Sequence, residues 1–247
     1  MGELRERFSA LMTGGADMRG VLLKAFSLSI LCTLFTAPYF HYLLFLSPAQ
    51  TTLPLKLNLK GFLVTQLFLL FIICLLSSIV GLSFSRKLEL PGIGDWQHFK
   101  KSIPYLFLLG AVMTILSYYA FDRYFFQISQ ASYPKDSIYL FTYPLKAAFT
   151  DEVILRLCFV TLAVGLFRNK IAGVVLVSAV ASVFTIKYFQ FMGIGFQFNY
   201  LSITQIMFSF WANIILGYLF VTRGLLYSMA LNFLLGMKYV IVSWSLG

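Results

Sequence analysis

Seven apolar stretches constrain the fold of this chain more than any other feature, because each is long enough to cross a membrane. A helix that spans the hydrocarbon core needs about 20 mostly apolar residues. The stretches of this length are residues 21–47, 61–84, 104–126, 142–167, 171–192, 203–222 and 225–245. Charged residues make up 11% of the chain, whereas soluble domains carry about 25%. We therefore expect an all-α polytopic membrane protein, a single bundle of about seven transmembrane helices.

The first stretch has two further interpretations. Pro38 allows a kink, or a break into two shorter helices that would raise the number of spans to eight. A signal peptide cleaved after Ala37 is disfavoured because the apolar run continues to Leu46. Residues 1–20 form a separate amphipathic segment, for which we expect a short helix lying in the membrane interface; the alternative is a frayed tail that ends at Gly14 and Gly15. Residues 21–247 then form the transmembrane bundle.

The distribution of basic residues predicts the orientation of the bundle. Eleven Lys and Arg residues fall on the side of the N-terminus: Arg5, Arg7, Arg19, Lys24, Arg86, Lys87, Lys100, Lys101, Arg168, Lys170 and Arg223. Four fall on the other side: Lys56, Lys60, Arg123 and Lys135. The positive-inside rule then places the N-terminus in the cytoplasm. Because the net charge of +10 is spread between apolar stretches rather than over one soluble face, we expect no nucleic-acid partner.

A charged cluster interrupts the fourth stretch. The sequence TDEVILR places Asp151, Glu152 and Arg156 near the middle of an expected span. Each such charge costs about 2.5–3.5 kcal/mol at the centre of a membrane helix, so the three side chains must face the bundle interior, a partner or a water-filled cavity. Glu152 and Arg156 lie four residues apart, on one helix face. Two interpretations remain open: a buried ion pair that fixes helix packing, or a functional site in which one carboxylate faces water.

Polar residues on later stretches are candidate neighbours of this cluster. Lys187 and Tyr188 lie in the fifth stretch, Asn213 lies in the sixth, and Asn232 and Lys238 lie in the seventh. The formal charges sum to zero, as expected for a shared buried network, over Asp151, Glu152, Arg156 and Lys187. We therefore expect Lys187 and Tyr188 to support the cluster together with Arg156. The alternative for Lys187 is to extend its amine toward the membrane interface.

The pattern resembles the CPBP family of CAAX-processing and bacteriocin-processing intramembrane endopeptidases, also called Abi proteins. Their first motif, E-E-x-x-x-R, is similar to Asp151-Glu152-x-x-x-Arg156. Their second, F-x-x-x-H, corresponds here to Phe184 through Tyr188. In the third motif, Asn232 takes the position of the histidine and Gly236 that of the following Asn or Asp. The similarity covers residues 142–240 and implies the cytoplasmic membrane of a prokaryote.

Both motif histidines are missing, which changes what the resemblance implies. The histidines of this chain are His41, near the end of the first stretch, and His98, which we expect in a loop. If the protein is an active endopeptidase, Asp151 is the base and Asn232 the oxyanion donor, with Glu152 beside them. No histidine or cysteine accompanies the acids, so we expect no metal and no cofactor.

Three functions follow from these observations. The leading hypothesis is an inactive CPBP-like protein that binds membrane lipid together with a membrane protein or membrane-proximal peptide, without cleaving it. The second is an active intramembrane endopeptidase with a reduced site of Asp151 and Asn232. The third is a component of an ion channel or transporter with the acids on the ion path.

Overall fold

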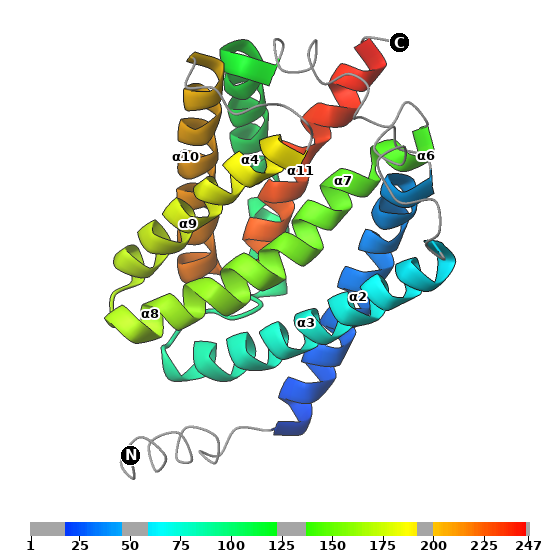
Figure 1. The fold of residues 1–247 in the computed structure, drawn as a ribbon. Helices are drawn as coiled ribbons and strands as arrows, with labels where there is room; N and C mark the ends of the chain where they lie inside the picture. Colours follow the sequence, from blue (N-terminus) through cyan, green and yellow to red (C-terminus); the bar gives the residue numbers. More distant parts are fainter. Residues whose placement is uncertain (1–17, 46–58, 123–136, 192–199, 246–247) are drawn as a thin grey trace.

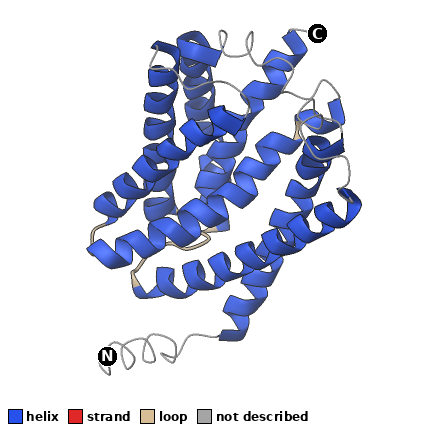
Figure 2. Ribbon diagram, viewed as in Figure 1, coloured by secondary structure: helices blue, strands red, loops and turns tan. Residues whose placement is uncertain are grey.

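The computed structural model describes residues 18–45, 59–122, 137–191 and 200–245, and these residues form helices joined by short connections (Figures 1 and 2). Six helices are each one main segment: α2 Met18–Phe45, α3 Leu59–Lys87, α4 Trp96–Ser117, α9 Lys170–Phe191, α10 Tyr200–Arg223 and α11 Leu225–Ser245. The π-helical turn η2 Tyr118–Asp122 extends α4. The remaining helix is a chain of pieces: α6 Ser137–Leu140, α7 Thr142–Lys146, η4 Ala147–Asp151, η5 Val153–Val160 and α8 Thr161–Phe167. The all-α prediction is therefore confirmed.

The helices follow the seven predicted stretches in order, and four of them are long and apolar enough to cross a membrane. These four are Met18–Phe45, Leu59–Lys87, Trp96–Ala120 and Ser202–Arg223. The continuous apolar parts of α9 and α11 with described side chains are Lys170–Phe184 and Leu225–Lys238. The four long helices indicate an integral membrane protein. Seven membrane spans remain a prediction.

Local features of α2 and α4 bear on two of the sequence expectations. The helix α2 runs through Pro38 as one element, rather than as two pieces. The helix α4 begins at Trp96, eight residues earlier than expected, because the side chain of Asp95 caps it by accepting a hydrogen bond from the amide of Gln97 at 2.8 Å. His98 therefore lies in the first turn of α4, so its predicted loop position is wrong. The expected interfacial helix lies outside the described residues, except that residues 18–20 belong to α2.

Asp95 also contacts His98, and both side chains are exposed. His98 Nδ1 lies 2.5 Å from Asp95 Oδ2. The hydrogen bond with His98 lowers the pKa of Asp95, and the backbone hydrogen bond from Gln97 lowers it further. Both contacts stabilise the ionised carboxylate at the start of α4.

The composite helix from α7 to α8 lies at the centre of the bundle. Its η5 segment packs against α3, α9 and α10, and its η4 segment packs against α2 and α11. The closest approach is at Gly81 of α3, where an added Cβ atom would lie 2.2 Å from the carbonyl oxygen of Leu157. Only a residue without a side chain allows this contact. Thr36 and Thr150 link α2 to η4 through hydroxyl groups 2.7 Å apart.

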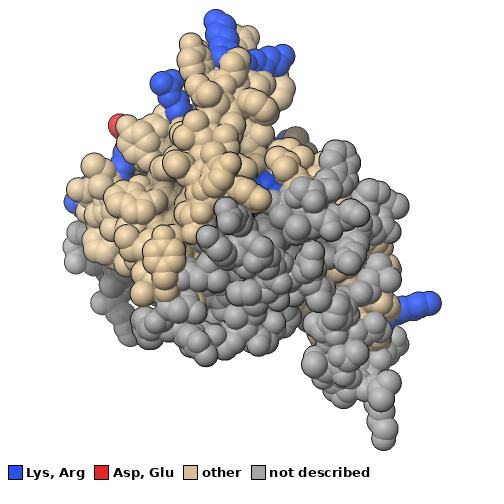
Figure 3. All heavy atoms as spheres, turned by 90° about the horizontal axis from the view of Figure 1, so that it is seen from above, with Lys and Arg blue, Asp and Glu red and all other residues tan. Residues whose placement is uncertain are grey.

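The outer surface of the bundle is mostly apolar. Its exposed side chains include Leu23, Val64, Phe68, Leu166 and Ile171. In the view from above, the described surface is largely uncharged, with Lys and Arg side chains toward its edges (Figure 3). The helix α2 begins at the lower end of the bundle, and α11 ends at the upper end (Figure 1). An outer surface with many exposed apolar side chains is expected for a protein in lipid.

Candidate functional site

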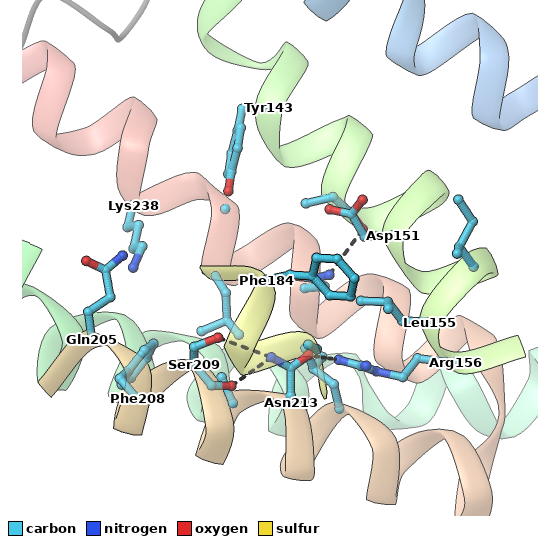
Figure 4. Close-up of a pocket in the computed structure, with 18 residues that line it drawn as sticks. Tyr143, Asp151, Leu155, Arg156, Phe184, Gln205, Phe208, Ser209, Asn213 and Lys238 are labelled. Carbon is cyan, nitrogen blue, oxygen red and sulfur yellow. Dashed lines mark hydrogen bonds between the residues drawn. The ribbon is translucent and has the colours of Figure 1, made fainter. Parts of the chain in front are cut away.

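A cavity of about 400 Å³ opens between the composite helix, α9, α10 and α11 (Figure 4). Its size lies within the usual range for small-molecule sites, about 300–1,000 Å³. Its polar lining comes from Tyr143, Asp151, Arg156, Gln205, Ser209, Asn213, Asn232 and Lys238. Most of the remaining lining is aliphatic or aromatic, including Leu155, Phe184 and Phe208. The cavity therefore combines apolar walls with a few convergent polar groups.

Asp151 lies at the edge of the cavity and is held by Lys146. The Lys146 amine is 2.7 Å from Asp151 Oδ1 and 2.8 Å from Oδ2. The two residues are five positions apart, which in an α-helix places them about 140° apart around the axis. The intervening segment is π-helical, and backbone hydrogen bonds in a π-helix join residues i and i+5. The π-helical geometry therefore brings Lys146 to Asp151.

Glu152 and Arg156 form a buried pair. Glu152 is 0% exposed and Arg156 is 1% exposed. Arg156 Nε lies 3.6 Å from Glu152 Oε2, which is an ion-pair distance but too long for a strong hydrogen bond. The other oxygen, Oε1, accepts a hydrogen bond from the Asn232 amide at 2.8 Å. The pair is thus tied to α11 as well as to its own helix.

Asn232 uses both of its amide hydrogens within this network. Its Nδ2 atom donates to Glu152 Oε1 at 2.8 Å and to the Ala147 carbonyl oxygen at 3.1 Å. An amide NH₂ group has only two hydrogens to donate. In this arrangement Asn232 has no hydrogen left for a reacting oxygen in the cavity.

Gly236, one turn further along α11, makes a close helix contact. A Cβ atom at this position would lie 2.7 Å from the Cα atom of Pro144. This is the position at which the resemblance places an Asn or Asp. The contact with α7 leaves no room for either side chain, so the packing itself accounts for the glycine.

Arg156 connects the buried pair to a row of polar side chains on α10. Its Nη2 atom donates a hydrogen bond to Asn213 Oδ1 at 2.5 Å, and Asn213 Nδ2 donates to the Ser209 carbonyl oxygen at 2.7 Å. Gln205, Ser209 and Asn213 recur every four residues and all line the cavity. Residues spaced in this way share one face of a helix. The row extends along α10 for about 12 Å, at about 1.5 Å per residue.

Lys238 contributes a second cation to the cavity lining. It is 8% exposed, and its amine donates a hydrogen bond to Ser117 Oγ at 2.8 Å. The same amine lies 5.3 Å from the centre of the Phe208 ring. Figure 4 shows Lys238 and Gln205 at one end of the cavity and Arg156 at the other.

The structure brings Asp151, Arg156 and Asn232 of the predicted site residues around one cavity, with Glu152 directly behind them. Lys187 and Tyr188 belong to α9, but their side chains lie outside the part of the chain that the structure describes. Sequence reasoning missed Lys146, Gln205 and Ser209 as site residues. The four-residue polar spacing along 205–213 was a usable signal for the last two, whereas no sequence signal pointed to the π-helical turn.

The described residues contain no group of three or more His, Cys, Asp or Glu side chains that could hold a metal ion. His41 accepts or donates a hydrogen bond with the Tyr139 hydroxyl at 3.0 Å and is not part of the cavity lining. No protein-family model, curated protein or solved structure matches the chain.

Proposed function

We propose that the chain is a CPBP-like integral membrane protein of seven spans that binds a membrane partner or peptide without cleaving it. In this proposal, the acid–arginine cluster holds the helices together and the cavity beside it receives the polar part of the ligand. The observation that carries the proposal is the commitment of both Asn232 hydrogens to Glu152 and Ala147. A hydrolytic site needs a donor that is free to stabilise the developing oxyanion.

The two carboxylates also favour binding over catalysis. Glu152 is fully buried and does not line the described cavity. Both oxygens of Asp151 lie 2.7–2.8 Å from the Lys146 amine, so a water bound to this carboxylate would have to share it with that ammonium group. No described histidine lines the cavity to share the proton transfer.

An active endopeptidase with a reduced site is the second candidate, because one observation favours it. Asp151 is 31% exposed and lines the same cavity as Asn232. Rotation of the Asn232 amide away from Glu152 would recreate a base and a donor on one cavity. The cost is one buried, unpaired carboxylate oxygen, and a group left in that state costs about 1–3 kcal/mol or more.

A cleavage assay separates the two candidates. The wild-type chain and Asp151→Asn are reconstituted in liposomes at equal amounts with a pool of transmembrane and lipid-anchored peptides. Mass spectrometry then searches for new peptide ends, with empty liposomes as the control. We expect no new ends that depend on the protein. Cleavage by the wild type that is lost in Asp151→Asn would establish the endopeptidase instead.

A crosslinking assay tests the binding part of the proposal. A photoreactive amino acid replaces Leu155, which lines the cavity, or Leu166, which is 76% exposed on α8. A discrete adduct in membranes is expected at position 155 and not at position 166. The same set of adducts at both positions would reflect ordinary lipid contact and would contradict a binding site.

A further inference from the structure

Arg156 has hydrogen-bonding capacity that the described protein atoms do not use. The side chain is 1% exposed, its Nε atom lies 3.6 Å from Glu152 Oε2 without a hydrogen bond, and its Nη1 atom has no hydrogen-bond partner among the described residues. A buried guanidinium with open N–H groups is costly unless something accepts from it. Because Arg156 also lines the cavity, an acceptor that enters the cavity can reach this side chain.

The charge around the cavity points to an anion as that acceptor. Five charged side chains of this region are described: Lys146, Asp151, Glu152, Arg156 and Lys238. Three positive and two negative groups leave a net charge of +1. Lys146 is matched by Asp151, so the excess is carried by the Arg156–Glu152 pair together with Lys238. One bound anion would neutralise it.

The walls of the cavity suit a hydrocarbon chain. Leu155, Leu216 and Leu235 line it together with Phe184 and Phe208. Phe184 is also 64% exposed, so the rim of the cavity reaches the outer apolar surface along α9. A molecule with an anionic head and an apolar tail could therefore enter sideways from the lipid.

We propose that the cavity binds an anionic amphiphile of the membrane. Its carboxylate or phosphate accepts hydrogen bonds from Arg156, and its chain lies against the apolar wall and leaves past Phe184. Asn213 and Ser209 lie next to Arg156 and provide further polar contacts to the head group, whereas Lys238 and Gln205 lie at the other end of the cavity. This inference rests on the proposed binding function and specifies the chemistry of the ligand. Guanidinium groups match carboxylate and phosphate oxygens in geometry as well as charge.

Ligand binding is tested with four probes on the purified full chain in a neutral maltoside detergent. Dodecyl phosphate and dodecanoate carry an anion and a chain, dodecanol carries the chain alone, and inorganic phosphate carries the anion alone. Each amphiphile is compared at the same mole fraction in the micelle, with isothermal titration calorimetry as the readout. We expect dodecyl phosphate and dodecanoate to bind at least about tenfold more tightly than dodecanol, and inorganic phosphate not to bind.

Variants of two alanines on α9 locate the site without disturbing the charged cluster. Ala181 lines the cavity, whereas Ala179 is exposed on the same helix. Ala181→Phe should weaken dodecyl phosphate binding by at least about tenfold, and Ala179→Phe should leave it unchanged. Arg156→Lys keeps the charge but loses the paired N–H groups, so it should weaken binding as well. Thermal unfolding of every variant is measured to check that the fold is retained.

Several outcomes would overturn the inference. If dodecanol binds as tightly as dodecyl phosphate, the cavity recognises only the apolar chain. If inorganic phosphate binds and the amphiphiles do not, the cavity is a site for free anions. Binding of a peptide with a free C-terminal carboxylate, but not of dodecyl phosphate, would assign the site to peptides. None of these results depends on cleavage, so the inference can fail while the non-cleaving proposal stands. Conversely, Asp151-dependent cleavage would remove the proposed function whatever the probes show.

Discussion

Replacement of Arg156 by glutamine tests the buried pair most severely. The change keeps a polar side chain of similar length but leaves the Glu152 carboxylate without its cation. At 3.6 Å and an effective dielectric constant of about 20, the lost attraction is about 4.6 kcal/mol. Removal of one partner from a buried ion pair costs about 3–5 kcal/mol in measured cases. Both values predict a free energy of unfolding lower by about 3–5 kcal/mol.

The measurement is equilibrium unfolding in mixed micelles, titrated with a denaturing detergent and followed by circular dichroism. The matched control is the double variant Glu152→Gln with Arg156→Gln, which removes both charges. It should be less destabilised than Arg156→Gln alone by at least about 2 kcal/mol, because no unpaired carboxylate remains. Two results would refute a dry buried pair. One is a decrease in the free energy of unfolding below about 1 kcal/mol for Arg156→Gln. The other is a double variant whose decrease equals the sum of those of Arg156→Gln and Glu152→Gln measured separately.

Three further predictions concern packing and capping. Gly81→Ala should destabilise the protein by about 3 kcal/mol or more in the same unfolding assay, because its Cβ would lie 2.2 Å from the Leu157 carbonyl oxygen. An unchanged free energy of unfolding would mean that α3 and η5 can move apart. Gly236→Ala should cost about 1–3 kcal/mol, since its Cβ would lie 2.7 Å from Pro144 Cα, and an unchanged midpoint would contradict this close contact. The pKa of Asp95 is lowered in the folded protein, so its contribution to stability is complete above the unfolded value of about 3.9. That contribution should disappear as pH falls through the folded pKa. Asp95→Asn should therefore lose the corresponding part of the pH dependence of thermal unfolding. An identical pH profile in the variant would show that Asp95 is not the source of this pH dependence.

The positions of the helices could be predicted from the sequence because the signal is local. Apolar runs of membrane length predicted seven helices in the correct order, with the largest difference at the start of α4. There the apolar run begins near residue 104, but the helix begins at Trp96. The Asp95 cap starts the helix among polar residues that hydropathy alone assigns to a loop.

The environment of the acidic pair could be predicted only in part. Charges in an apolar stretch must face inward, and Asp151 and Arg156 do line an internal cavity. The partner of Asp151 was not predictable, because α-helical spacing separates Lys146 from it and only the π-helical turn brings the two together. A hydropathy pattern contains no information about such a turn.

The orientation of Asn232 was also beyond sequence reasoning. Its place on α11 was compatible with a donor aimed at the cavity or at the acids. The geometry of the neighbouring helix decides between them, since the Ala147 carbonyl and Glu152 both lie within reach of its amide. In the proposed binding site, the Asn232 amide is committed to Glu152 and Ala147, whereas a catalytic site would need it to donate to a reacting oxygen in the cavity.

An experimental structure with a bromine-labelled anionic amphiphile, 11-bromoundecanoate, tests the central claim most directly. Anomalous scattering locates the bromine, and the electron density shows the partners of each polar group. We predict the carboxylate at Arg156, the bromine against the apolar wall near Phe184, and Asn232 still bonded to Glu152 and Ala147. An empty cavity with an ordered water held between Asp151 and a rotated Asn232 amide would contradict the account and indicate a hydrolytic site.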